Sequence, residues 1–170
     1  MANAEVLFAE HRDGVFRYLS RIVGHADTAQ DLTQEVFLRV ARVPVPDAEA
    51  AGRRAWVFKI ARNLALNHIR DCQRRPELAE ETDAGRPATQ ELGAALSQAL
   101  GALPDLDRDV FLMRESAGLT YQEIATACEL TPDAVRSRLH RARQQLRAAL
   151  SGPIASECRA GLQACRDRRT

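Results

Sequence analysis

The C-terminal third of this 170-residue chain holds its densest group of hydrogen-bonding side chains. Arg136, His140 and Gln144 recur every four residues, and Ser137 and Arg141 form a second row beside them. On a helix all five project from one side. Such a row fits the major groove of DNA, where arginine bonds guanine bidentately and the other side chains read further base edges. The spacing therefore predicts a DNA-reading helix, with a solvated charged helix of an ordinary bundle as the alternative.

The residues around this row predict two short helices joined by a tight turn. Thr120 and Glu123 have the spacing of a capping box, which begins the first helix. Thr131 can cap the second helix, and Pro132 suits its first position. Four apolar residues form the predicted buried stripe of the second helix: Val135, Leu139, Ala142 and Leu146. Three arginines near the edges of the polar row are placed to meet phosphates: Arg138, Arg143 and Arg147.

The net charge of +1 hides a strong segregation of charge along the chain. Residues 53–75 contain seven basic residues and one acidic residue, whereas residues 76–109 contain two arginines and eight carboxylates. Residues 132–150 contain five arginines and one aspartate. Two basic blocks separated by an acidic block predict two polyanion-binding surfaces.

Helical periodicity dominates the chain and predicts an all-α fold. The expected helices cover residues 4–23, 28–43, 53–73, 90–101 and 104–116, followed by the helix-turn-helix. Residues 76–89 are polar, acidic and interrupted by glycine and proline, which is the composition of a flexible linker. The chain therefore divides into two small helical domains, 1–75 and 90–150, with a tail at 151–170. Because the linker reaches at most about 50 Å, the tethered domains could touch one duplex more than a helical turn apart.

The second helix has an apolar side and a mainly polar side. Its predicted buried stripe is Leu32, Val36, Val40 and Val43, flanked by Phe37. The opposite face consists of Asp31, Gln34, Glu35, Leu38, Arg39 and Arg42. Leu38 is an apolar residue among charges, which indicates either an interface or an ordinary exposed leucine.

The third helix has a basic outer face, composed of Lys59, Arg62, Asn63, Asn67, Arg70 and Arg74. Trp56, the only tryptophan, lies at the start of this helix. An aromatic ring beside cations can stack on an unpaired base while the cations hold the backbone of a single strand. The alternative is that Trp56 and Phe58 are core residues, which is the role that we expect for Phe58.

Composition excludes several classes of protein. The N-terminus lacks a basic leader followed by an apolar run, and no apolar stretch approaches the ~18 residues that span a bilayer. We therefore expect a cytoplasmic protein with no stable membrane association of its own. The four cysteines lack the density of a disulfide framework and are expected to be reduced. The histidines are scattered and no HExxH, P-loop or glycine-rich nucleotide motif is present, so we expect neither an enzyme nor a cofactor.

Three motifs carry a resemblance to a known family. They are DLTQEVFLRV at 31–40, RAWVFKIARNLALNHIR at 54–70 and LPDLDRDVFLMRESAGLTYQEIATACELTPDAVRSRLHRAR at 103–143. In order and spacing the chain resembles the extracytoplasmic-function (ECF) group of bacterial RNA polymerase sigma factors, within the sigma-70 family. The resemblance runs from about residue 7 to residue 150, which is nearly the whole chain.

The resemblance implies a non-enzymatic subunit that binds RNA polymerase core and directs promoter-specific transcription initiation. It makes residues 1–75 sigma region 2 and residues 90–150 sigma region 4. The second helix would contact the clamp helices of the largest polymerase subunit through Asp31, Gln34, Glu35, Leu38 and Arg39. The third helix would capture and melt the −10 promoter element through Trp56, Lys59, Arg62, Asn63 and Arg70. The last helix would read the −35 element through Arg136, Ser137, Arg138, His140 and Arg141. Regulation by an anti-sigma factor is also implied.

Two features depart from the family pattern. The loop 44–52, PVPDAEAAG, is rich in proline and alanine where the family forms a pocket for a flipped base, so the −10 specificity is not predicted. The tail extends past the usual end of the domain and carries Cys158 and Cys165 seven residues apart. Two cysteines without a histidine cluster do not make a zinc site, so we expect a disordered tail, with metal or redox sensing as the alternative.

The main alternative function is a stand-alone helix-turn-helix regulator that binds duplex operators and uses its N-terminal domain to sense or dimerise. This alternative predicts operator binding without polymerase, whereas the family resemblance predicts initiation that depends on polymerase core.

Overall fold

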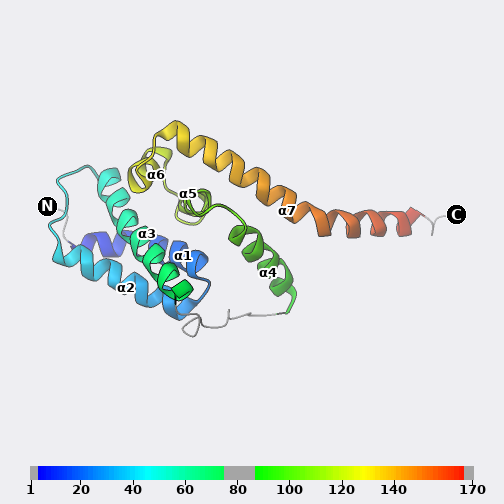
Figure 1. Ribbon diagram of the computed structural model, residues 1–170, viewed down its shortest axis with the longest axis horizontal. Helices are drawn as coiled ribbons and strands as arrows, with labels where there is room; N and C mark the ends of the chain where they lie inside the picture. Colours follow the sequence, from blue (N-terminus) through cyan, green and yellow to red (C-terminus); the bar gives the residue numbers. More distant parts are fainter. Residues whose placement is uncertain (1–3, 75–86, 167–170) are drawn as a thin grey trace.

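The computed structural model describes residues 4–74 and 87–166, with side chains described for 4–74 and 93–151. Within these ranges the chain forms seven helices and no strand, as the periodicity predicts. In chain order the helices are α1 Ala4–Val23, α2 Ala26–Arg42, α3 Ala50–Arg74, α4 Pro87–Gly101, α5 Asp105–Glu115, α6 Tyr121–Cys128 and α7 Pro132–Arg166 (Figure 1).

The N-terminal domain is a bundle of α1, α2 and α3, in which each helix contacts the other two. The predicted stripe of α2 is buried at Val36, Phe37 and Val40. The prediction for Val43 is wrong, because its side chain is 50% exposed. The helix ends at Arg42 and Val43 follows with extended backbone, so the helical periodicity stops before this residue.

The C-terminal domain contains the predicted helix-turn-helix, formed by α6 and α7, which packs against α5. Both arms of the capping box are present: Thr120 Oγ1 accepts from the backbone N–H of Glu123 at 3.2 Å, and Glu123 accepts from the backbone N–H of Thr120 at 2.7 Å. Thr131 Oγ1 accepts from the backbone N–H of Ala134 at 3.2 Å, which confirms the cap of α7. Between the helices Glu129 adopts a left-handed backbone with φ 57°, and this residue ends α6. The predicted stripe of α7 is buried at Val135, Leu139, Ala142 and Leu146.

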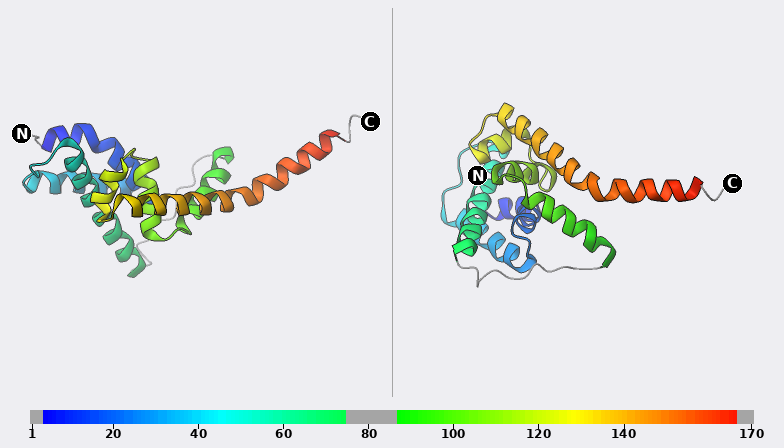
Figure 2. Two further views of the ribbon diagram at one scale, coloured as in Figure 1. Left: turned by 90° about the horizontal axis from the view of Figure 1, so that it is seen from above. Right: turned by 45° about the vertical axis from the view of Figure 1, so that its right-hand side comes forward.

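The last helix is longer than predicted. We expected a disordered tail from residue 151, but α7 continues to Arg166 and extends away from the rest of the molecule (Figures 1 and 2). The side chains of Cys158 and Cys165 lie outside the described part of the structure.

The two domains pack against each other, with α6 against α3 and α5 against α1. Their buried apolar residues form one continuous cluster. The linker would allow the two domains to separate, but in this structure they are in contact. The reason is that α5 and α6 present carboxylates and free carbonyls to cations of α1 and α3, as described below.

We predict that Thr120→Ala lowers the free energy of unfolding by about 1 kcal/mol, because the backbone N–H of Glu123 loses its acceptor. Urea denaturation measures this change. Thr126→Ala in the same helix is the control, because Thr126 Oγ1 donates only to the carbonyl of Gln122 and alanine has the higher helix propensity. An equal loss of stability in both variants would contradict the role of the cap.

Candidate nucleic-acid interface

The basic face of α3 lies where the two domains meet. Among the residues predicted to bind the −10 strand, Asn63 and Arg70 are exposed and Trp56 is partly buried against the core. Lys59 and Arg62 form ion pairs with carboxylates of the C-terminal domain. The structure therefore brings part of the basic face of α3, at Lys59 and Arg62, against acidic groups of the other domain.

Asp109 of α5 is the buried centre of this contact. Its carboxylate accepts hydrogen bonds from Arg62 Nε at 2.8 Å and from the hydroxyl of Tyr18 at 3.1 Å. Asp109 is 2% exposed and Tyr18 is 0% exposed. Burial raises the pKa of Asp109, while the charge of Arg62 and the hydrogen bonds from both donors act in the opposite direction. Removing one partner from a buried pair typically costs about 3–5 kcal/mol, so this network ties α5 to both α1 and α3.

Lys59 makes a second, more exposed contact across the domains. Its Nζ lies 2.5 Å from Oε1 of Glu129, and the hydrogen bond lowers the pKa of Glu129. The Lys59 side chain is 42% exposed and that of Glu129 is 74% exposed, so water screens this pair. Glu129 is the left-handed residue that ends α6, and the tight turn of the helix-turn-helix thus places its carboxylate over α3.

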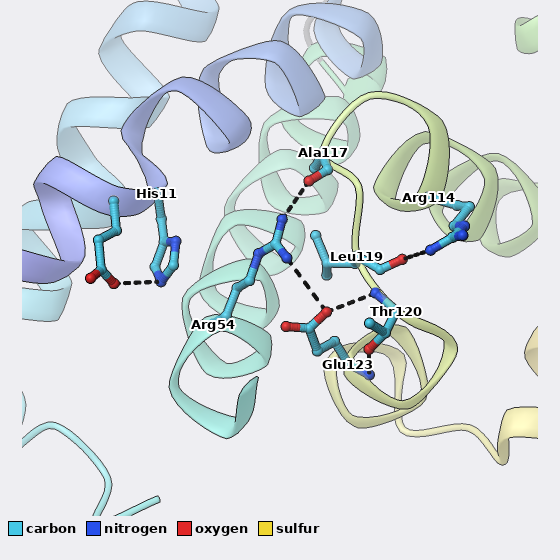
Figure 3. A network of polar contacts seen from close by, with 8 residues as sticks. His11, Arg54, Arg114, Ala117, Leu119, Thr120 and Glu123 are labelled. Atoms are coloured by element: carbon cyan, nitrogen blue, oxygen red, sulfur yellow. Dashed lines mark hydrogen bonds and ion pairs between the residues drawn. The ribbon is translucent and has the colours of Figure 1, made fainter. Parts of the chain in front are cut away.

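Two arginines bind the C-terminal end of α5. Arg54 Nη2 donates to the carbonyl of Ala117 at 2.5 Å, and Arg17 Nε donates to the carbonyl of Ser116 at 3.0 Å. The end of a helix leaves such carbonyls without intrahelical donors and carries a partial negative charge. Arg54 Nη1 also lies 3.6 Å from the carboxylate of Glu123, the residue of the α6 capping box (Figure 3).

His11 lies at the edge of the same network (Figure 3). Its side chain is 13% exposed, and its Nε2 lies 3.7 Å from the carboxylate of Glu10. Burial lowers the pKa of His11 and the charge of Arg54 lowers it further, whereas Glu10 and Glu123 raise it.

The polar row predicted on α7 is exposed to solvent at Arg136, Ser137, His140, Arg141 and Gln144. Two of these residues have partners in the first turn of the helix. Arg136 pairs with the carboxylate of Asp133 at 3.0 Å, and Ser137 Oγ donates to the backbone carbonyl of Asp133 at 3.0 Å. Because these contacts are local to α7, the row remains open to a ligand.

Asp107 of α5 sets the position of this row. Its Oδ1 lies 2.6 Å from Arg138 Nη1, and its Oδ2 lies 3.5 Å from Arg141 Nε. Asp107 is 2% exposed. Arg138 therefore holds α7 against α5, while its contact with DNA stays a prediction.

The predicted partner-binding face of α2 points away from the bundle. Asp31, Gln34 and Arg39 are exposed, and Leu38 is 49% exposed. Glu35 accepts a hydrogen bond from Arg39 Nε at 2.7 Å within the helix. A hollow of about 430 Å³ between α1 and α2 opens beside this face, and Gln34 lines it. The face is thus free to meet another macromolecule.

Comparison with known proteins matches each domain to a family. The Sigma-70 region 2 family matches residues 7–75, and the Sigma-70, region 4 family matches residues 93–146. The ECF RNA polymerase sigma factor SigE of Mycolicibacterium smegmatis is 35% identical over 86% of this chain and 61% of its own length. The ECF RNA polymerase sigma factor SigL of Mycobacterium tuberculosis is 33% identical over 85% of this chain and 86% of its own length. This chain belongs to the ECF RNA polymerase sigma factors of the sigma-70 family.

The family assignment agrees with the fold. The sigma factor RpoE from Bartonella quintana, solved in complex with the anti-sigma factor NepR, has a TM-score of 0.64 at 19% identity over 87% of this chain and 96% of that chain. The chain spans less than two thirds of the length of the SigE relative. In the terms of the family, the contacts described above join sigma region 2 to sigma region 4.

Sequence reasoning about this sigma factor missed the acidic residues that organise the interface. One signal for Asp109 was available, because it occupies an apolar position of α5 at helical spacing from Leu106, Leu112 and Met113. A carboxylate on an apolar stripe must find a donor when the helix packs. No local pattern identifies Glu129, because its contact with Lys59 is made across 70 residues.

Two expected absences concern only the described residues. Within them no three side chains of His, Cys, Asp or Glu gather to hold a metal ion. The cysteine pair of the tail, for which metal or redox sensing was the alternative, lies outside the residues searched. Among the helices searched, none combines the length and apolar character that crossing a membrane requires.

We predict that this sigma factor loses stability as the pH falls through about 6.5, the ordinary pKa of histidine, and that His11 is one source of the loss. The pKa of His11 is lowered in the folded state, so the unfolded chain binds the proton more tightly. The contribution of His11 to the free energy of unfolding is therefore complete above the pKa that this residue has in the unfolded chain, and it declines below that pH. Urea denaturation over a pH series should show a shallower decline for His11→Gln. His140→Gln removes an exposed imidazole and should keep the native slope; the same slope in both variants would exclude His11.

Proposed function

We propose that this sigma factor binds RNA polymerase core through α2, captures an unpaired −10 strand with α3 and reads −35 duplex DNA with α7. The observation that carries the proposal is that sigma-70 regions 2 and 4 match the two domains that bear these polar faces. Sigma factors are non-enzymatic, so the polymerase supplies the chemistry of RNA synthesis.

The core-binding face consists of Asp31, Gln34, Glu35, Leu38 and Arg39, and its partner is the pair of clamp helices in the largest polymerase subunit. Leu38 is a half-exposed apolar residue surrounded by charged side chains. Binding energy in protein interfaces concentrates at such central residues, while the surrounding charges set orientation and association rate.

The strand-capture face consists of Trp56, Lys59, Arg62, Asn63 and Arg70 of α3. The cations bind the phosphate backbone, and Trp56, which is only partly buried against the core, stacks on an unpaired base. Opening DNA costs about 1.4 kcal/mol per base-pair step. Each captured base returns about 1–3 kcal/mol, so capture of a few bases offsets the opening of a short segment.

The duplex-reading face consists of Arg136, Ser137, Arg138, His140 and Arg141 of α7. Arginines at the centre of the row can bond guanine bidentately in the major groove, and those at its edges can bind phosphates. Asp107 lies 2.6 Å from Arg138 and 3.5 Å from Arg141. It therefore holds Arg138 more closely than Arg141. Arg141 is therefore the better placed of the two for base recognition.

The protein acts in the cytoplasm, where RNA polymerase and promoters are, and an anti-sigma factor regulates it. Regulation by an anti-sigma factor is supported by the similar fold of a sigma factor that was solved in complex with one. Such a partner can act by covering any of the three faces.

Run-off transcription with purified polymerase core on a promoter library tests the proposed function. We expect transcripts only when both core and this chain are present, from promoters that share a −35 and a −10 element. Sequence-specific binding to duplex operators without core, together with no core-dependent transcripts, would instead establish a stand-alone helix-turn-helix regulator.

We predict that Leu38→Asp weakens binding to polymerase core about tenfold or more, because it places a charge at the apolar centre of the face. A binding titration with fluorescently labelled protein measures the effect, and urea denaturation should show native stability. Val6→Asp is the matched control, since Val6 of α1 is 46% exposed and Leu38 is 49% exposed. Equal affinities of the two variants would remove Leu38 from the core-binding face.

We predict that Arg141→Ala changes the preference among −35 sequences, because loss of a bidentate base contact costs about 1–3 kcal/mol at one position. Arg147→Ala, further along α7, should weaken binding uniformly and reduce its salt dependence, as loss of a phosphate contact does. Binding to a randomised −35 library, measured by sequencing, distinguishes the two. A uniform loss for Arg141→Ala would reassign this residue to the phosphate backbone.

A further inference from the structure

We propose that Cys72 of α3 is a reactive thiol that His68 activates, and that its substrate is a low-molecular-weight disulfide. The two residues lie outside the sets assigned above to polymerase and DNA, so the inference goes beyond the proposed function and does not depend on it. It is drawn from the contact between the two side chains and from the contrast with a second cysteine, Cys128.

The side chains of His68 and Cys72 lie one helical turn apart on the same side of α3. Cys72 Sγ is 3.4 Å from Nε2 of His68, which is a hydrogen-bond distance for sulfur. When Nδ1 of His68 carries the ring proton, Nε2 accepts the hydrogen bond from the thiol. A nucleophile and a base within hydrogen-bond reach of each other form the arrangement that activates a cysteine.

The length of α3 brings this pair to the surface. The helix has 25 residues, whereas α1 has 20 and α2 has 17. Ala61 and Ala65 precede His68 on the same side of the helix and are buried, but His68 and Cys72 are only partly buried. Their neighbours Asp71, Gln73 and Arg74 are exposed. A small disulfide can therefore reach Sγ of Cys72 without any opening of the core.

Cys128 has the opposite surroundings. Of the two cysteines whose side chains the structure describes, it is the buried one, and its Sγ lies 3.7 Å from the sulfur of Met113. Burial raises the pKa of Cys128 to about 12, although the charges of Arg62 and Arg138 act in the opposite direction. Because the thiolate is the nucleophile, Cys128 is unreactive and serves as an internal reference for Cys72.

The proposed reaction is thiol–disulfide exchange. Sγ of Cys72 attacks one sulfur of the disulfide while Nε2 of His68 takes the thiol proton. A new S–S bond joins Cys72 to one half of the disulfide and the original S–S bond breaks. The other half leaves as a thiolate, which takes the proton from His68. The disulfide is the oxidant, so no further oxidant enters the reaction.

The product is a mixed disulfide near the end of α3, and a reducing thiol removes it by the same exchange. In a reducing compartment the thiol form of Cys72 is the resting state. The site therefore makes this sigma factor responsive to the ratio of disulfide to thiol around it.

The test uses the full chain and dithiobis(nitrobenzoic acid), an aromatic disulfide, as the probe. Peptide mass spectrometry over a time course gives the rate of labelling of each cysteine separately. Three chains are compared: the native chain, His68→Gln and His25→Gln. His25 is the matched control because it is also a partly buried histidine, and it makes no capping hydrogen bond through its side chain.

We expect Cys72 of the native chain to react about tenfold faster than N-acetylcysteine at pH 7, since an isolated thiol is only about 3% ionised there. His68→Gln should lose this advantage, and His25→Gln should keep it. Cys128 should stay unlabelled in all three chains.

A purely structural role of His68 predicts a change of the opposite sign. Loss of packing around Cys72 would expose its thiol and raise the labelling rate, and Cys128 would begin to react. The proposal is overturned if Cys72 of the native chain reacts no faster than N-acetylcysteine, or if His68→Gln leaves the rate unchanged or raises it. These measurements involve neither polymerase nor DNA, so their outcome is independent of the test of the proposed function.

Discussion

The burial of Asp109 is the constraint on which the arrangement of the two regions depends. A carboxylate with 2% of its surface exposed is costly unless it is paired and hydrogen-bonded. Region 4 contains Asp109, but both of its side-chain donors, Tyr18 and Arg62, belong to region 2 and come from different helices. Satisfying one charge therefore fixes α5 against α1 and α3 together. The contacts of Arg17, Arg54 and Lys59 lie around this centre and extend it toward solvent.

The charge pattern of the chain takes on a structural meaning through this contact. The net charge of +1 results from basic and acidic blocks that lie far apart in the sequence. In the folded chain, carboxylates of α5 and the α6 turn neutralise cations of α3. A few of the opposite charges thus pair between the two regions, while the arginine row of α7 is exposed and can meet an external polyanion.

The three functional faces differ in where their polar side chains find partners. On α2, Glu35 and Arg39 pair with each other one turn apart, and on α7, Arg136 pairs with Asp133 in the first turn. Such local pairs are exposed and easily exchanged for contacts with a partner. On α3, Lys59 and Arg62 pair across the domains, and exchange of the buried Arg62–Asp109 pair requires movement of α5. The same residue types therefore make local pairs on α2 and α7 and pairs between domains on α3, where Asn63 and Arg70 remain exposed.

Residue spacing along the chain is enough to predict the local elements of this sigma factor. The capping box of Thr120 and Glu123, the cap at Thr131 and the buried stripe of α7 all follow from spacings of three and four residues, which a helix converts directly into contacts. The partners of Arg62 and Lys59 lie 47 and 70 residues away in the chain, and only the packing of whole helices brings them together. Periodicity shows which side of a helix is polar, but not which distant group meets it. Pairing of that kind depends on how whole helices pack, because only the assembled fold brings Asp109 out of water and beside its donors.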